Sequence, residues 1–327
     1  MASILLKSLN IVSKDNDTRV LQYKTHPSYA GNVINFKRVM NIFGIHIHNE
    51  YVEELFVTYL QTVIFALILY FILCSISYMF FFKIKKDKYL PEYKNKNLII
   101  WHEIKWSIIN ILLEAILVSA LRMTLTRWSF VYFDVNDYGY LYLVVSVIFH
   151  IIFDETFTYW IHRIFHTNRT LYRYLHRIHH ESEDVTPFAG FSFHPLDAFS
   201  QAIPTFTSCF FFPLHYDILL FFSVMTSVWA ISIHDNVPYI PIKLFLYSTH
   251  HTIHHEQGIG KFRNYGKFTT VWDRLAGTYS DPDKINYGWK RNEKVKNIFD
   301  KINSYIDKYI PDRTLKTGVK VKGSKEN

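Results

Sequence analysis

The chain has only two cysteines in 327 residues, Cys74 and Cys209, and both lie in apolar segments. They are expected to pack against other apolar side chains and not to form a disulfide, so they do not indicate the redox compartment. No cleavable signal peptide is evident, because the first long apolar run begins near residue 55, beyond the N-terminal stretch where such signals lie. Apart from the recurrence of an H-x2-H-H pattern, internal repeats are lacking, and so are low-complexity linkers. One membrane-embedded domain is therefore expected over 55–282, between an N-terminal segment, 1–54, and a charged C-terminal tail, 283–327.

No basic patch interleaved with exposed aromatic residues stands apart from the apolar segments, which argues against nucleic acid as a partner. The formal net charge is nevertheless +8, from 36 basic and 28 acidic residues. An excess of positive charge fits the anionic lipid headgroups of a cytosolic membrane surface. The composition thus favours a lipid bilayer as the partner.

What the chain has is apolar sequence in long runs: 49% of its residues are hydrophobic and 18% are aromatic. A bilayer core of about 30 Å needs about 20 apolar residues in a helix. Three runs are candidate crossings: 55–82, 106–121 and 138–160. A fourth run, 199–233, is broken at 212–217 and predicts a helical hairpin with short arms, which could be re-entrant.

The distribution of lysines predicts the orientation of these runs. Short basic loops remain in the cytosol, and the loop between the first two runs is of this kind. The second run then leaves the cytosol and the third returns to it. The hairpin brings His234 back to that cytosolic face. The loop between the first two runs is basic through Lys83, Lys85, Lys86, Lys88, Lys94 and Lys96. The predicted fold is all-α, a polytopic membrane protein with about four to five hydrophobic segments and a cytosolic histidine-rich di-metal cap.

Twelve of the seventeen histidines fall between His162 and His255. Helical residues three or four apart share one face, so each tight group can direct its imidazoles at one point. A catalytic zinc takes about three protein ligands, so eight imidazoles predict a two-metal site. Imidazole suits zinc, copper, iron and nickel alike, and the spacing leaves the element open. The groups are His162 and His166; His176, His179 and His180; and His251, His254 and His255. Core or interface roles are expected for His26, His46, His48, His102 and His215.

The order and spacing of these groups resemble the fatty acid hydroxylase and sterol desaturase superfamily, and within it the sterol C5-desaturase branch. The resemblance is strongest over 154–282. Other motifs that carry it are Tyr159-Trp160, Phe193-His194-Pro195, Ile233-His234-Asp235, Asn264-Tyr265-Gly266 and Trp272-Asp273-Arg274.

The resemblance implies an oxygen-activating oxidoreductase of the endoplasmic reticulum membrane with two irons per chain and its active site facing the cytosol. Its substrates would be O2 and a delta-7 sterol, into which it would introduce a C5–C6 double bond. Cytochrome b5 and an NAD(P)H-dependent cytochrome b5 reductase would supply electrons. The eight grouped histidines and His234 are the implied iron ligands.

Other residues near the motifs have open roles. His194 and His250 are either further ligands or neighbours, His194 orienting a ligand and His250 flanking the last group. Asp154 and Glu155 are either partners of imidazoles or a polar cap at the membrane edge. Thr252, inside the last group, is a candidate for tuning the reaction on substrate.

Two departures from the family pattern bear on the identity of the sterol: Lys267 stands where glutamine is common, and 256–260 lacks the usual aromatic residues. A C4-methyl sterol oxidase or a fatty acid 2-hydroxylase would share the histidine groups, but the Ile233-His234-Asp235 and Asn264-Tyr265-Gly266 motifs favour the desaturase. A membrane haem electron carrier would need single histidines facing each other across helices. A zinc hydrolase would need an H-E-x-x-H glutamate, which is missing, and a non-catalytic scaffold is disfavoured because no group has lost a histidine.

Overall fold

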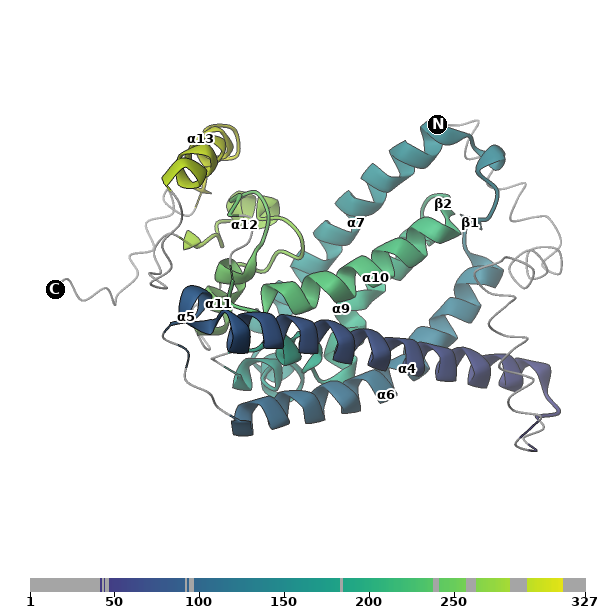
Figure 1. The fold of residues 1–327 in the computed structure, drawn as a ribbon. Helices are drawn as coiled ribbons and strands as arrows, with labels where there is room; N and C mark the ends of the chain where they lie inside the picture. Colours follow the sequence, from purple (N-terminus) through teal and green to yellow (C-terminus); the bar gives the residue numbers. More distant parts are fainter. Residues whose placement is uncertain are drawn as a thin grey trace. The chain divides into compact units, whose positions relative to one another are not determined.

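The computed structural model describes residues 42, 44, 47–91, 93, 97–182, 185–237, 241–256, 263–282 and 293–313, and nearly all of their regular structure is helical (Figure 1). Several residues used in the sequence analysis lie outside this described part. They are residues 1–41 with His26, then His46, Lys94, Lys96, 257–260 and 314–327.

Four helices are long and apolar enough to cross a membrane. Each reaches the length that a hydrocarbon core of about 30 Å demands. The helices are α4, Glu50–Ser77, which continues as a π-helical segment, Tyr78–Ile84; α6, Asn97–Trp128; α7, Tyr140–Thr167; and α10, Tyr216–Ile233. The predicted all-α class with about four to five hydrophobic segments is confirmed. The run 106–121 forms only the middle of α6, because the flanking residues 97–105 and 122–128 are helical too.

The fourth apolar run forms an unequal hairpin. Its first arm is α9, Pro195–Thr207, followed by a 3-10 turn, Ser208–Phe210, and its second arm is α10. Pro195 occupies the first turn of α9, where its missing N–H costs nothing. At 13 residues α9 is too short to count among the four candidate crossings.

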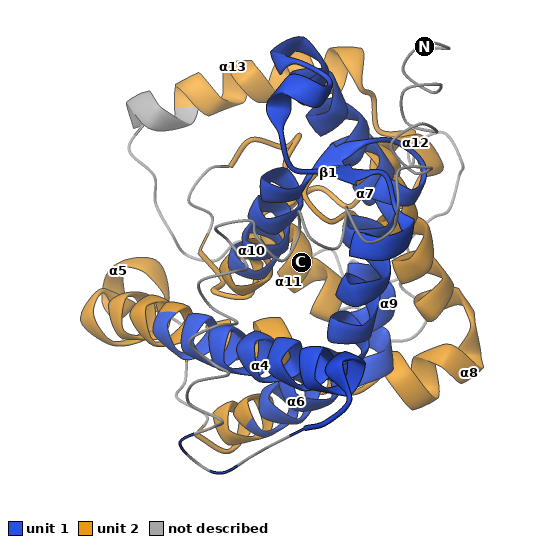
Figure 2. Ribbon diagram, turned by 90° about the vertical axis from the view of Figure 1, so that its right-hand side faces the viewer, with its two compact units in different colours: residues 1–72, 105–154, 193–228 blue, residues 73–104, 155–192, 229–327 orange. Residues whose placement is uncertain are grey.

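The chain divides into two compact units that interleave along the sequence, and the division falls within each of the four long helices (Figure 2). Unit 1 comprises 1–72, 105–154 and 193–228. Within it, β1, Val131–Tyr132, pairs in parallel with β2, Leu214–His215, and the Phe130 amide donates to the Cys209 carbonyl at 2.7 Å. The break in the hairpin therefore lies beside the connection between α6 and α7, which also contains a 3-10 turn, Val135–Asp137.

The N-terminal part of α4 also belongs to unit 1. Arg127 near the end of α6 pairs with Glu54 of α4 at 3.0 Å. Val57, Val131 and Tyr216 form a buried cluster beside this ion pair. Unit 1 thus gathers the end of α6 and the starts of α4 and α10 around one core.

Unit 2 comprises 73–104, 155–192 and 229–327 and carries the histidine groups. Its shorter elements include those that carry most of these histidines. The shorter elements are α5, Lys86–Tyr89; α8, Arg169–Leu171; a π-helical turn, Tyr172–His176; 3-10 turns, His179–Glu181 and Pro187–Phe191; α11, Ser248–Glu256; α12, Val271–Ala276; and α13, Glu293–Tyr309. Helix α13 falls in the segment that the sequence analysis treated only as a charged tail.

Candidate metal centre

Nine buried histidines of unit 2 form two groups, within each of which the candidate ligand atoms all lie within 4.8 Å of one another. We call them the five-histidine group and the four-histidine group. The first contains His162, His166, His176, His180 and His254, and the second contains His179, His234, His251 and His255. These are the eight histidines of the sequence motifs together with His234. The structure therefore brings together every residue for which the sequence predicted a ligand role, apart from those given open roles.

Helical geometry explains how each motif divides between the groups. Residues four apart project within about 40° of each other, whereas adjacent residues diverge by about 100°. In α11, His251 and His255 therefore share the four-histidine group, while His254 points to the five-histidine group. Likewise His176 and His180 go to one group and His179 to the other. Each H-x2-H-H motif thus supplies both groups and holds them next to each other.

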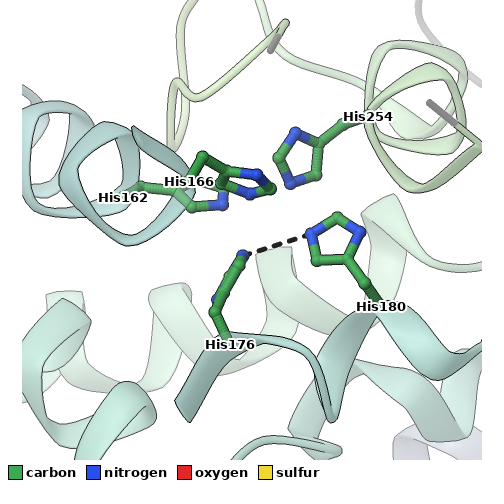
Figure 3. Close-up of side chains that lie close together, drawn as sticks. All are labelled: His162, His166, His176, His180 and His254. Carbon is green, nitrogen blue, oxygen red and sulfur yellow. Dashed lines mark hydrogen bonds between the residues drawn. The ribbon is translucent and has the colours of Figure 1, made fainter. Parts of the chain in front are cut away.

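Figure 3 shows the five-histidine group, whose imidazoles point toward one another from three segments of the chain. His162 and His166 come from one face of α7, and His254 comes from α11. The Nε2 atoms of His176 and His180 are 3.1 Å apart. In the four-histidine group, His255 Nε2 lies 3.1 Å from both His179 Nε2 and His251 Nε2, and His251 Nε2 lies 2.9 Å from His234 Nε2.

Backbone carbonyls orient several of these rings. A carbonyl oxygen can only accept, so an Nδ1 beside it carries the proton and leaves the Nε2 lone pair facing the centre of its group. This is the arrangement by which proteins fix imidazole ligands for a metal. The pairs are His162 with Tyr265 at 3.1 Å, His254 with Arg263 at 2.8 Å, His179 with Ser192 at 3.3 Å, His255 with Ser182 at 3.1 Å and His234 with Ala230 at 2.5 Å.

The donor set fits transition-metal ions. The buried Nε2 atoms of His162 and His254 have no hydrogen-bond partner among the described residues. A buried polar atom without a partner costs about 1–3 kcal/mol, and a metal–nitrogen bond would remove that cost. Imidazole nitrogens are suitable ligands for iron and for zinc, so both groups could hold an ion.

Burial keeps these imidazoles in the form that binds metal. It lowers the pKa of His234 to about 4 and that of His254 to about 3, although a backbone carbonyl partly opposes the effect in each case. Burial, with repulsion between neighbouring imidazoliums, places the pKa values of His179, His251 and His255 well below the usual value. At neutral pH all five rings are uncharged, as metal ligation requires.

Two further histidines that the sequence left open lie outside both groups. His194 belongs to unit 1, where its Nδ1 accepts from the Leu196 amide at 3.2 Å and caps the start of α9. His250 is buried in unit 2 with its Nε2 3.5 Å from the Tyr279 hydroxyl. Thr252 is also buried, and its hydroxyl, which has one proton to donate, lies 2.7 Å from Asn236 Oδ1 and 3.0 Å from the Ser248 carbonyl oxygen.

The two acidic residues before His162 take different partners. Asp154 accepts from the Thr205 hydroxyl at 3.0 Å within unit 1. Glu155 accepts from the amide and the hydroxyl of Thr269 at 3.0 and 3.1 Å within unit 2. Neither carboxylate belongs to a histidine group, and Glu155 instead fixes the loop that follows Lys267.

Asp273 supports the centre in a way that the sequence analysis did not assign. Its carboxylate accepts from the amides of Tyr265 and Gly266, both at 2.8 Å, and from the Thr278 hydroxyl at 2.7 Å. The carbonyl of Tyr265 is the one that faces His162. Burial raises the pKa of Asp273 to about 6 against the opposing effect of these hydrogen bonds. The sequence marks these residues only through the family resemblance, whose motifs include both Asn264-Tyr265-Gly266 and Trp272-Asp273-Arg274.

Comparison with known proteins matches the region of the chain that contains the histidine groups. The family model described as fatty acid hydroxylase matches residues 147–278. The lathosterol oxidase of Rattus norvegicus is 36% identical over 72% of this chain and 78% of its own length. The lathosterol oxidase of Homo sapiens is 37% identical over 67% and 73%. The Delta(7)-sterol 5(6)-desaturase of Candida albicans is 34% identical over 69% of this chain and 57% of its own length. No solved structure matches.

Proposed function

Because the chain belongs to the fatty acid hydroxylase family, we propose that it is a delta-7-sterol 5(6)-desaturase. It is an oxidoreductase with several membrane helices. The observation that carries the proposal is the convergence of nine buried histidines in two adjoining groups, in a chain whose relatives are named as lathosterol oxidases and delta-7-sterol 5(6)-desaturases.

The reaction removes two hydrogens, at C5 and C6 of the sterol. One O2, two electrons and two protons are consumed with them, and two water molecules leave. Two irons, one in each histidine group, would supply the oxidant for breaking these unactivated C–H bonds. The neutral imidazoles would hold the metal, and the backbone carbonyls behind them fix the ring orientations. Burial of the groups excludes water and so prevents side reactions of the oxidant.

We propose that cytochrome b5 and its NAD(P)H-dependent reductase deliver the electrons, at the cytosolic face of the endoplasmic reticulum membrane. The positive charge of the loop after α4 supports a cytosolic position for this loop. Within unit 1, the break between α9 and α10 reaches the connection between α6 and α7. A helical hairpin starts and ends on the same face of the membrane. This arrangement therefore supports placing all the histidine motifs on that one face.

The relatives favour the desaturase over the other chemistries that share the histidine motifs. C4-methyl sterol oxidation and fatty acid 2-hydroxylation leave an oxygen atom in the product, whereas the relatives are named as lathosterol oxidases and a Delta(7)-sterol 5(6)-desaturase. A membrane haem carrier would use two single histidines on facing helices, unlike groups of five and four.

The test is expression in a host that lacks its own sterol C5-desaturase. The expected product is a conjugated 5,7-diene sterol, which has its own ultraviolet absorption, and it should be absent with the His254→Ala chain. Accumulation of a 4-hydroxymethyl sterol or a 2-hydroxy fatty acid without diene would assign the protein to another activity of the same family.

A further inference from the structure

Helix α13 carries an exposed apolar stripe along its length. The exposed fractions are 59% for Ile298, 37% for Ile302, 64% for Tyr305 and 70% for Tyr309. These residues are spaced by four, three and four positions, which places them on one face of a helix. Four large apolar or aromatic side chains on one short helix form a continuous surface that water solvates poorly.

Helix α13 is firmly attached, because another of its faces contacts the rest of unit 2. The Asn303 side chain is buried, accepting from the Lys243 amide at 2.8 Å and donating to the Pro241 carbonyl at 3.0 Å. Asp307 pairs with the buried Arg274 at 2.8 Å. The same guanidinium donates to the carbonyl of Ile310 at 2.9 Å. The contacts that hold the helix therefore leave the stripe pointing outward.

Charge is segregated around this stripe. At about 100° per residue, Lys301 and Lys308 lie about 70–90° from its centre, whereas Asp300 and Asp307 lie about 170° from it. Lys301 and Lys308 are both exposed. The sequence that follows the helix is also basic, with Arg313, Lys316, Lys320, Lys322 and Lys325. Both lysines lie on the same side of the stripe, so one edge of the apolar surface carries positive charge.

We infer that α13 lies in the headgroup region of an anionic bilayer, with its stripe immersed and its lysines at the lipid phosphates. Amphipathic helices with a basic edge bind membranes in this way. Tyrosines such as Tyr305 and Tyr309 suit that depth, because their rings are apolar and their hydroxyls remain hydrated. The chain already carries four candidate crossings, so a bilayer is at hand without the entropic cost of bringing two molecules together.

The test uses the full chain in lipid nanodiscs of phosphatidylcholine with phosphatidylserine. A nitroxide is attached after Ile302→Cys or, as the matched control on another exposed face of α13, after Ser304→Cys. Cys74 and Cys209 are fully buried, and labelling of the unsubstituted chain measures their background. Collision with O2, which concentrates in lipid, is compared with collision with a water-soluble nickel chelate.

A label at position 302 should favour O2 over nickel by severalfold relative to the label at position 304. Each lysine near an anionic surface strengthens attachment about fivefold, so Lys301→Glu with Lys308→Glu should raise nickel access at position 302 in these discs. The same pair should have little effect in discs of phosphatidylcholine alone.

Three results would overturn the inference. Equal nickel access at positions 302 and 304 would place the stripe in water. Protection of position 302 from both reagents would mean that protein covers it. Immersion that is indifferent to the lysine substitutions in anionic discs would remove the role of anionic lipid.

Discussion

The Nδ1 atom of His162 lies 3.1 Å from the carbonyl oxygen of Tyr265, more than 100 positions away in the chain. Through this contact α7 meets the loop of the Asn264-Tyr265-Gly266 motif within unit 2. Because Asp273 accepts from the two amides that follow Asn264, the carboxylate, the loop and the imidazole form one connected support. Orientation of His162 thus depends on Asp273 and on the Tyr265 backbone, while the Tyr265 ring itself packs against the rings of His162, His166 and His254, with centroids 5.5, 5.1 and 5.7 Å away.

Asp273→Asn should weaken metal binding in the five-histidine group. The Tyr265 amide donates to Oδ1 and the Gly266 amide to Oδ2, so asparagine places an NH2 donor opposite one of these N–H groups and leaves that N–H unpaired. Loss of such a supporting contact typically lowers metal affinity about 10–100-fold. Metal retention during dialysis against graded chelator would measure this. Asp300→Asn, on the exposed side of α13, is the control and should bind metal normally. Equal retention by both variants would show that the loop orients His162 without the carboxylate.

Metal analysis of the gently purified chain should give two transition-metal ions per chain, because two groups of imidazoles are present. Iron should accompany activity. Overexpressed protein is expected to contain some zinc, because zinc binds such sites more tightly than ferrous iron. Chelation should abolish turnover, and iron, but not zinc, should restore it. A content of one ion or none after mild purification would contradict the two-group assignment.

Single histidine substitutions should separate the two groups. His254→Ala removes a nitrogen from the five-histidine group and His179→Ala one from the four-histidine group, so each should abolish turnover and lower the metal affinity of its own group while the other group keeps its ion. His215→Ala is the control. Its ring accepts from the Asp217 amide and contacts the Phe133 carbonyl in unit 1, so it should cost about 1 kcal/mol of stability and leave metal and turnover intact. Substantial activity in the His254 variant would mean that this ligand assignment is wrong.

The sequence predicted the nine grouped histidines because the relevant information is local or carried by the family motifs. Spacings of three and four residues fix which imidazoles share a helical face. The distribution into five and four could not be predicted, since it depends on where His234 and the His179 turn pack against α11. The role of Asp273 was missed for the same reason, because its partners are backbone amides and leave no trace in residue type. Helix α13 was missed because its charged residues masked the stripe of Ile298 and Ile302.

The proposed orientation can be checked with two natural acceptor sequences for N-glycosylation, Asn16-Asp17-Thr18 and Asn168-Arg169-Thr170. If the basic loop after α4 is cytosolic, the N-terminal segment lies on the opposite face and the His162 end of α7 is cytosolic. Asn16 should then be glycosylated in a eukaryotic host and Asn168 should not. The gel shift should disappear with Asn16→Gln and persist with Asn168→Gln. Sugar on Asn168 would place the histidine motifs on the lumenal side.

Gly190→Ala should disturb the four-histidine group through the backbone. A Cβ at this glycine would lie 2.9 Å from Ile231 Cα and 3.1 Å from the Ala230 carbonyl oxygen, the oxygen that faces His234 Nδ1. Neither atom belongs to a flexible side chain, so the turn containing Gly190 or the end of α10 must move. Overpacking of this kind typically costs about 1–3 kcal/mol, and the displacement should lower metal affinity at His234 more than at His254.

Thermal unfolding and metal retention of Gly190→Ala should be measured beside Gly139→Ala. At Gly139 an added Cβ meets nothing within 4 Å, but φ is +81°, so that substitution brings only backbone strain of about 1–2 kcal/mol. Both variants should unfold at lower temperature, and only Gly190→Ala should lose an ion at chelator concentrations that the unsubstituted chain tolerates. If the two variants retain metal equally, the contact between Gly190 and the end of α10 does not position His234. The Ala230 carbonyl would then keep the His234 ring in place even when the backbone around it moves.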